Sequence, residues 1–518
     1  MEFEALKDLA KTVFQSKVKN IEILGNPNKK KNKTDLFFEF LINGDAKSES
    51  ETVRYLFKSH DIKYPSYVKL KKKLTKQLID TSFFVDVDNP IYNDRAKSYF
   101  TCYKDFAASI ILLSRGSDLS SIFLLEKIFE QSVKYEFIDL AAETSKWLRY
   151  QYARSNSDYE KNNHYTKLQR YYEDKRRWEA IAFDYQEDLM SYYIIKRSPN
   201  ELLYKKACAY LDELMKVASE VDTSSFYKCF YNIAVVKYMS IKDYEAAILI
   251  CDEALHVLES KKTANRSTIA SFNLQKIALF TQIRFLDKGC VEKLFNKCTE
   301  FYSKGEYSWF RVCETFIYYL FSVSDFEKAL LEYKNSYTSV KTSNLKGSYM
   351  ENWLLIGGYI HLISNFGLLD ASEVEQVVGK FKYSKIYNDI EILKKDKEGM
   401  NIPLLLLPVL YELAQAPKDR TKEIPIEALD KYRQRWLAND MNRRSNSFLK
   451  ILLTLAQSAG TSIVNEKKIK KEWEILKNET PDVAGQSYAI EIIPYETLIE
   501  LLFAKWGLSG ILQPEATP

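Results

Sequence analysis

Apolar residues recur along most of this 518-residue chain at intervals of three and four positions, the spacing of an amphipathic helix. Clear examples are Phe106–Leu113, Ile122–Phe129 and Phe137–Leu148. A further stretch, about 157–195, contains neither Gly nor Pro. It predicts one long helix, on the order of 55 Å at a rise of about 1.5 Å per residue.

Glycine and proline are scarce. The chain has 15 Gly and 12 Pro, together about 5% of the residues, against a usual level of roughly 12%. No proline occurs between Pro90 and Pro199, or between Pro199 and Pro403. Since proline breaks helices and turn-rich β folds need many Gly and Pro residues, we predict an all-α protein.

A pattern of small and aromatic residues occurs twice between about 200 and 340. In 228–260 it comprises Tyr231, Ala234, Tyr238, Tyr244, Ala247, Ile248, Cys251, Ala254 and Leu255. In 310–338 it comprises Cys313, Phe316, Ile317, Leu320, Phe326, Ala329, Leu330, Tyr333 and Ser336. Ala247, Cys290 in a poorer middle copy, and Ala329 are 43 and 39 positions apart. This pattern predicts two helices per copy, with the small residues where the helices touch.

These copies resemble tetratricopeptide repeats. The likeness lies in Tyr238 near the end of the first helix, in Tyr244 and Phe326 opening the second, and in the Ala–aliphatic pair that follows. The period is nearer 40 than the usual roughly 34 residues, and the closing proline is missing. The resemblance implies an α-solenoid, a right-handed superhelix of helix pairs with a concave ligand groove.

Three segments are predicted. Residues 1–90 form a basic helical N-terminal segment, 91–400 the helical repeat region, and 401–518 a helical C-terminal segment that begins in a cluster of prolines. Within the repeat region, Gly357–Gly358 predicts a close approach of two helices. Capping boxes, in which a hydroxyl and a carboxylate three residues apart satisfy free amides, are predicted at Ser324 with Glu327 and at Ser372 with Glu375.

Positive charge is concentrated near the N-terminus. The net charge is +5, yet residues 1–80 hold 17 Lys and Arg against 11 Asp and Glu. In the helix predicted after Pro65, apolar residues occupy one side and four lysines the other, namely Lys69, Lys72, Lys73 and Lys76. With the short helix at 50–59 before it, this has the pattern of a helix-turn-helix.

A plain solvated lysine face is the alternative, and it is favoured because the helix starts with Ser66 and Tyr67 instead of a base-reading Arg, Asn or Gln. Lysines alone would attract phosphates without sequence choice.

Motifs of catalysis are missing from the sequence. The glycines form no phosphate-binding loop or nucleophile elbow, the four histidines have no metal-ligand spacing, and the seven cysteines include no CxxC. We therefore expect no catalytic, cofactor or metal site. The first residues are acidic where an export signal is basic, and the longest apolar runs are too short to cross a membrane. We expect a cytoplasmic protein without a membrane partner.

The leading hypothesis is a non-enzymatic scaffold or regulator that binds a protein or peptide in the repeat groove. By analogy with inner helices of repeat arrays, the candidate groove residues are Asn232, Lys237, Asn273, Lys276 and Tyr319. The long helix carries more tyrosines than one buried stripe needs, so some are expected to meet a partner or a second subunit of a homodimer; they are Tyr165, Tyr171, Tyr172, Tyr185, Tyr192 and Tyr193. Two alternatives stay open: a nucleic-acid-binding regulator that uses residues 1–90, and an enzyme with an unrecognised site.

Overall fold

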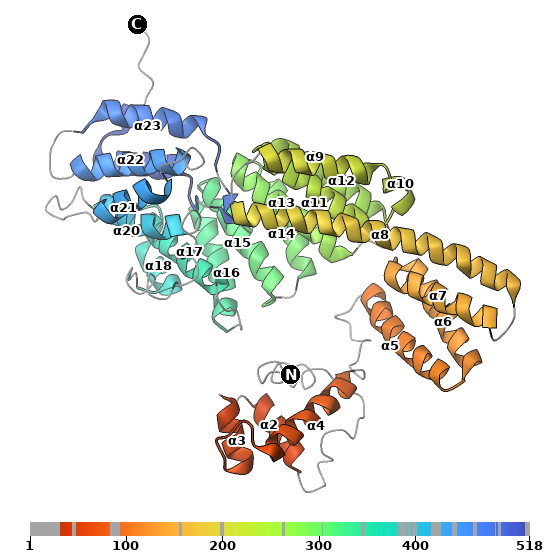
Figure 1. Ribbon diagram of the computed structural model, residues 1–518. Helices are drawn as coiled ribbons and strands as arrows, with labels where there is room; N and C mark the ends of the chain where they lie inside the picture. The colour runs from red at the N-terminus through yellow and green to blue at the C-terminus, as the bar shows by residue number, and fades with distance from the viewer. Residues whose placement is uncertain are drawn as a thin grey trace. The chain divides into compact units, whose positions relative to one another are not determined.

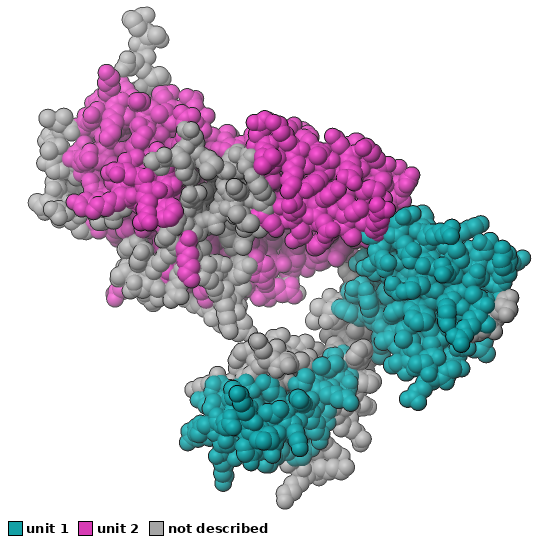
Figure 2. Space-filling model, viewed as in Figure 1, with its two compact units in different colours: residues 1–176 teal, residues 177–518 magenta. Residues whose placement is uncertain are grey.

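The protein is built almost entirely of helices (Figure 1). The computed structural model describes residues 32–43, 48–82, 94–154, 158–196, 201–261, 265–302, 304–342, 348–380, 382, 390, 395, 401–415, 426–437, 443–458, 464–481, 483–484, 488–489 and 491–512. Within these ranges the strands are β1 (Val483–Ala484) and β2 (Tyr488–Ala489), which pair antiparallel. The predicted all-α fold is confirmed. The chain divides into two compact units, residues 1–176 and 177–518 (Figure 2).

The first unit begins with three short helices, α2 (Lys33–Ile42), α3 (Glu49–Phe57) and α4 (Pro65–Ser82). The side chain of Asn32 starts α2 by accepting hydrogen bonds from the amides of Thr34 and Asp35 at 2.8 and 3.0 Å. The three helices enclose a small core made by Phe37, Leu41, Val53, Leu56, Tyr67, Leu74 and Leu78. The predicted apolar side of α4 is therefore the side that packs.

The rest of the first unit is a run of longer helices, α5 (Asp94–Ser114), α6 (Asp118–Lys134) and α7 (Ile138–Arg154), followed by the start of α8 (Tyr159–Lys196). Gly116 makes the turn from α5 to α6 with a φ of 75°, a conformation that glycine adopts without strain. The helix predicted over about 157–195 is α8, and its residues belong to both units.

The second unit continues with helices that pack as neighbouring pairs. They are α9 (Glu201–Met215), the single turn α10 (Ala218–Val221), α11 (Ser224–Met239), α12 (Tyr244–Ser260), α13 (Arg266–Ile283), α14 (Lys288–Phe301), α15 (Tyr307–Ser322), α16 (Phe326–Thr342), α17 (Ser348–Asn365) and α18 (Ala371–Val378). Each helix contacts the next along the chain, and α13 also contacts α15. This is the arrangement of a helical repeat.

Equivalent turns join the two helices of the best repeat copies. Lys242 and Ser324 both adopt a left-handed conformation, with φ of 59° and 57°. The next amide then reaches back across the turn, from Asp243 to the carbonyl of Tyr238 at 3.0 Å and from Asp325 to that of Leu320 at 2.8 Å. Such bonds satisfy carbonyls at a helix end, so the sequence likeness of the two copies corresponds to a shared backbone geometry.

Helices α20 (Asn401–Gln415), α21 (Ile426–Tyr432), α22 (Arg443–Ser458), α23 (Glu466–Asn478) and α24 (Tyr495–Trp506) follow, with a π-helical turn at Arg433–Leu437 and a 3₁₀ turn at Ser509–Leu512. One hydrophobic core runs from Tyr231 to Ile511 and so includes residues of both the repeat helices and these last helices. The hydroxyl of Tyr359 on α17 donates to the carbonyl of Pro403 on α20 at 2.9 Å.

Gly357 lies where α17 meets its neighbours, as predicted for a close helix approach. A methyl group at this position would lie 2.9 Å from both the hydroxyl of Tyr333 and Cγ1 of Val378. Tyr333 is fully buried and cannot move aside easily. We expect Gly357→Ala to lower the free energy of unfolding by about 1–3 kcal/mol through overpacking, measured by urea denaturation.

The control for this prediction is Gly289→Ala in α14. Its nearest neighbour would be an oxygen of Asp287 at 3.4 Å, an ordinary contact, and alanine is the better helix former. Stability should stay level or rise slightly. Equal stability of the two variants would contradict the close approach.

Candidate functional site

A row of three side-chain amides crosses the first helices of successive pairs. Gln186 is on α8, Asn232 on α11 and Gln275 on α13. The Asn232 amide donates to the side-chain oxygen of Gln186 at 3.0 Å, and Gln275 donates to the oxygen of Asn232 at 3.1 Å. All three are partly exposed. We call these three residues the amide row.

The helices that carry the row are fixed by apolar packing on their other sides. Ala182 and Leu189 of α8, Cys229 and Ile233 of α11, and residues of α9 share one buried cluster, while Phe272 on α13 belongs to the larger core. Burial raises the pKa of the Cys229 thiol to about 11. The amides therefore project from rigid elements.

The five groove residues predicted from the sequence lie in different surroundings in the structure. Asn232 belongs to the amide row. Lys237 is half-buried, with Nζ 4.9 Å from the ring centre of Tyr238 and 5.6 Å from that of Tyr204. The other three are buried: Asn273 is 2% exposed, Lys276 8% and Tyr319 0%.

Two of those buried side chains hold helices together. Lys276 on α13 forms an ion pair with Asp252 on α12. The Tyr319 hydroxyl donates to the carbonyl of Phe285 at 2.8 Å, and burial raises its pKa to about 12. Neither lies on an open surface. The structure thus leaves Asn232 and Lys237 as the partly exposed members of the predicted set.

Gln186 and Gln275 are not among the groove residues predicted from the sequence. A signal was available, because Gln186, Asn232 and Gln275 follow one another at intervals of 46 and 43 residues, close to the repeat spacing of 43 and 39. A search for polar residues recurring at the repeat period would have found them.

The tyrosines of the long helix are largely engaged within the chain. Tyr165 and Tyr172 are buried beside Phe129 in the first unit. In the second unit, Tyr185 stacks on Tyr210 with ring centres 3.8 Å apart and donates to a carboxylate of α9 at 2.7 Å. Tyr171 is 50% exposed. Tyr192 and Tyr193 belong to the same predicted set, and their side chains lie outside the described part of the structure.

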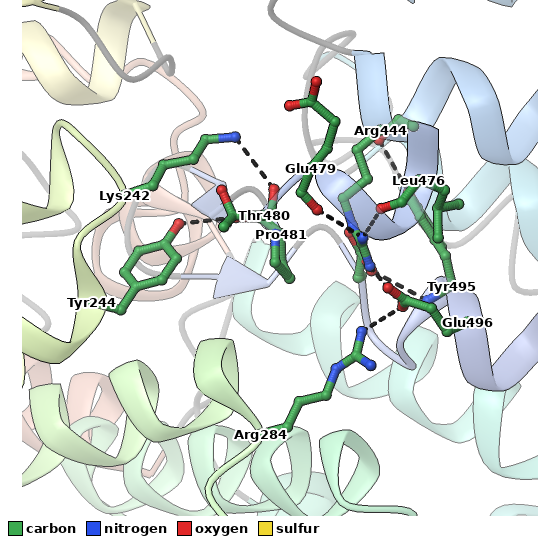
Figure 3. A network of polar contacts seen from close by, with 12 residues as sticks. Lys242, Tyr244, Arg284, Arg444, Leu476, Glu479, Thr480, Pro481, Tyr495 and Glu496 are labelled. Atoms are coloured by element: carbon green, nitrogen blue, oxygen red, sulfur yellow. Dashed lines mark hydrogen bonds and ion pairs between the residues drawn. The ribbon is translucent and has the colours of Figure 1, made fainter. Parts of the chain in front are cut away.

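A polar network around Arg444 joins the last helices to the repeat helices (Figure 3). All five N–H groups of the Arg444 guanidinium donate hydrogen bonds: two to Glu491, one to Glu496 at 2.7 Å, and two to the carbonyls of Leu476 and Glu479 at 2.7 and 2.9 Å. Arg284, at the end of α13, forms an ion pair with the same Glu496.

Charge compensation explains why these groups are tolerated in the interior. Arg444 is 2% exposed. Burial alone would lower the pKa of its guanidinium, but Glu491 and Glu496 outweigh burial and the pKa is raised. Burial would likewise raise the pKa of Glu496, but Arg444 and Arg284 hold it below its usual range.

The same segment touches a repeat turn. Lys242 donates to the carbonyl of Thr480 at 3.3 Å, and the hydroxyl of Tyr244 donates to that of Pro481 at 2.9 Å (Figure 3). Tyr244 opens α12 in the resemblance to tetratricopeptide repeats. Here its hydroxyl links α12 to the segment that follows α23. The network therefore has a structural role.

The predicted basic side of α4 is exposed in the first unit. Lys69, Lys72, Lys73 and Lys76 all lie on the surface. The connection between α3 and α4 comprises residues 58–64 and is longer than the three- or four-residue turn of a DNA-binding helix-turn-helix.

Among the described residues, no group of three or more His, Cys, Asp or Glu side chains could hold a metal ion. Within the same residues, no helix combines the length and the apolar character needed to cross a membrane. Comparison of the chain with protein-family models, with curated proteins and with solved structures found no match.

Proposed function

We propose that the second unit binds an extended polypeptide segment along the amide row, and so acts as a scaffold or regulator. The observation that carries this proposal is the alignment of Gln186, Asn232 and Gln275 across three successive first helices. We also infer that α11–α12 and α15–α16 are tetratricopeptide-like pairs, since Tyr244, Ala247, Phe326 and Ala329 are buried where that pattern needs them.

Side-chain amides suit a main-chain ligand. Each carries two N–H donors and an oxygen with two lone pairs, the same groups that a peptide bond offers. Within the row, Asn232 uses one donor toward Gln186 and accepts one bond from Gln275. Its amide has capacity for a further donor and a further acceptor, so an approaching backbone can bond to it without breaking the row.

The spacing also favours an extended chain. Packed helices lie about 8–10 Å apart, and three residues of an extended strand span roughly 10 Å. Every third residue of such a ligand would meet a new amide. The span from α8 to α13 corresponds to about six ligand residues. A row fixed by packed helices loses little conformational freedom on binding.

A reducing compartment such as the cytoplasm is consistent with the cysteines. All seven are free thiols, and five of them are buried. Reduced cysteines are usual in cytosolic proteins. We accordingly propose a cytoplasmic polypeptide ligand.

Selection of peptides on the full-length protein tests this function. Random peptides of about 12 residues, roughly twice the expected span, are selected by display and their dissociation constants measured. The variant Gln186→Ala with Asn232→Ala and Gln275→Ala should bind the selected peptides 10-fold to 1,000-fold more weakly, since each hydrogen bond contributes about 0.5–1.5 kcal/mol.

The matched control removes three exposed amides from second helices: Asn296→Ala on α14, Asn335→Ala on α16 and Gln376→Ala on α18. It should bind as the unaltered protein does. Selection of no peptides, or equal losses in the two triple variants, would contradict the proposal. Circular dichroism confirms that both variants are folded.

A further inference from the structure

The four exposed lysines of α4 form one continuous cationic face. Residues of a helix are about 100° apart, so Lys69, Lys72, Lys73 and Lys76 fall within a single arc of roughly 100°. The arc lies opposite the side on which Tyr67, Leu74 and Leu78 are buried. From Lys69 to Lys76 the helix rises about 10 Å. We call these four lysines the lysine face.

The charge of the lysine face is not cancelled locally. Within the described residues none of its four members forms an ion pair, whereas Lys71, on another side of α4, pairs with Glu49 at 2.7 Å. Glu49 also accepts a hydrogen bond from Tyr67 at 3.1 Å. The carboxylate of Glu49 is thus engaged by residues outside the lysine face. Apart from Asp80, the helix carries only positive charges.

A groove of about 440 Å³ runs along one flank of this face. Lys72 and Lys76 line it together with Ile62, Val68 and Ile79, and the ion pair of Lys71 with Glu49 also lines this groove. Ile62 and Ile79 are 47% and 44% exposed. Ammonium groups beside exposed apolar carbons match a sugar–phosphate backbone, in which phosphates alternate with apolar sugar rings.

We propose that the lysine face binds the phosphate backbone of double-stranded DNA. The major groove of B-form DNA is about 12 Å wide and admits a helix, whereas the deep, narrow major groove of double-stranded RNA does not. Duplex DNA carries one negative charge per roughly 1.7 Å of its axis. A face about 10 Å long therefore meets several phosphates at once.

Binding of this kind tolerates many sequences. Phosphate contacts fix position but carry no sequence information. The first turn of α4 exposes Ser66 and buries Tyr67, so no Arg, Asn or Gln side chain stands there to read bases. The connection between α3 and α4 is longer than the turn of a base-reading helix-turn-helix, which is also consistent with binding that does not depend on DNA sequence. This DNA-binding site on α4 is separate from the amide row of the second unit, for which we propose a polypeptide ligand.

Fluorescence anisotropy with the full-length protein and a mixed-sequence DNA duplex about three helical turns long tests the proposal. Four phosphate contacts predict that log K falls with log salt at a slope of about −3.6, or on the order of 100-fold between roughly 50 and 200 mM. Changing the four lysines of the face to Gln should weaken binding more than about 10-fold and flatten the slope. Changing them to Arg should retain binding.

The matched control changes four exposed lysines of α23, Lys467, Lys468, Lys471 and Lys477, to Gln. Net charge changes by the same amount, and DNA binding should persist. The proposal is wrong if the unaltered protein fails to bind at about 50 mM salt, or if the α4 and α23 variants lose equal affinity. The proposal is also wrong if the protein binds single-stranded RNA or double-stranded RNA more tightly than it binds the DNA duplex. Circular dichroism verifies folding, which exposed substitutions should not disturb.

Discussion

Replacement of Arg444 by Met lowers the free energy of unfolding of the second unit by about 3–5 kcal/mol, because it leaves buried carboxylates without their main cation. Glu491 loses both of its hydrogen bonds from Arg444 and Glu496 loses one. The carbonyls of Leu476 and Glu479 lose their donors as well. Urea denaturation followed by circular dichroism measures the change.

Arg443 supplies the control for Arg444→Met. It is the preceding residue of α22, its side chain is 54% exposed, and it pairs with Glu479 at 3.3 Å. Since exposed ion pairs contribute only about 0–1 kcal/mol, Arg443→Met should have little effect. Adding Glu491→Gln to Arg444→Met should recover part of the lost stability, because one uncompensated charge is removed. A loss for Arg444→Met as small as that for Arg443→Met would show that the network does not fasten the last helices.

Trp353→Ala should destabilise the second unit by about 3–5 kcal/mol through a cavity in the core. Trp353 is fully buried on α17. Its ring centre lies 5.6 Å from that of Tyr333 on α16 and 6.2 Å from that of Phe310 on α15. Three consecutive helices therefore lose a shared contact when the indole is removed.

Trp353→Phe separates the cavity from the polar part of the indole. The Nε1–H group of Trp353 has no hydrogen-bond partner among the described residues, so phenylalanine removes side-chain volume without breaking a hydrogen bond. We expect a loss of about 1 kcal/mol, in proportion to the smaller cavity. Equal losses for the Phe and Ala variants, both measured in urea, would mean that packing around the indole is not what stabilises these helices.

The arrangement of helices was largely predictable, since it follows from local patterns. Small and aromatic residues at helical spacing placed Tyr244, Ala247, Phe326 and Ala329 in contacts between helices, and these side chains are buried. The long helix was predicted within two residues of its observed ends.

Helix starts were less predictable. The capping boxes expected at Ser324 and Ser372 are wrong, because an aspartate, and not the serine, occupies the position directly before each of these helices. Asp325 directly precedes α16, while Ser324 occupies the left-handed turn. Asp370 caps α18 by accepting from the amide of Glu373 at 2.9 Å. Ser, Thr and Asp are all good caps, and composition alone does not choose among neighbours.

Site residues could not be assigned from helix positions alone. Lys276 and Gln275 are adjacent in α13, yet one forms an ion pair toward α12 and the other faces α11. That difference depends on how each helix is rotated against its neighbours. The Arg444 network was equally hidden, since its side-chain partners lie 47 and 52 residues away. Ion pairs between residues far apart in the chain produce no periodic pattern in the sequence.

Photocrosslinking tests most directly whether the amide row holds a polypeptide. A photoreactive amino acid is placed at position 275, on the first helix α13, and separately at position 335, on the second helix α16. Each protein is then irradiated with a peptide selected on the unaltered protein. We expect covalent attachment from position 275 and none from position 335. Attachment from position 335 alone would contradict binding along the amide row.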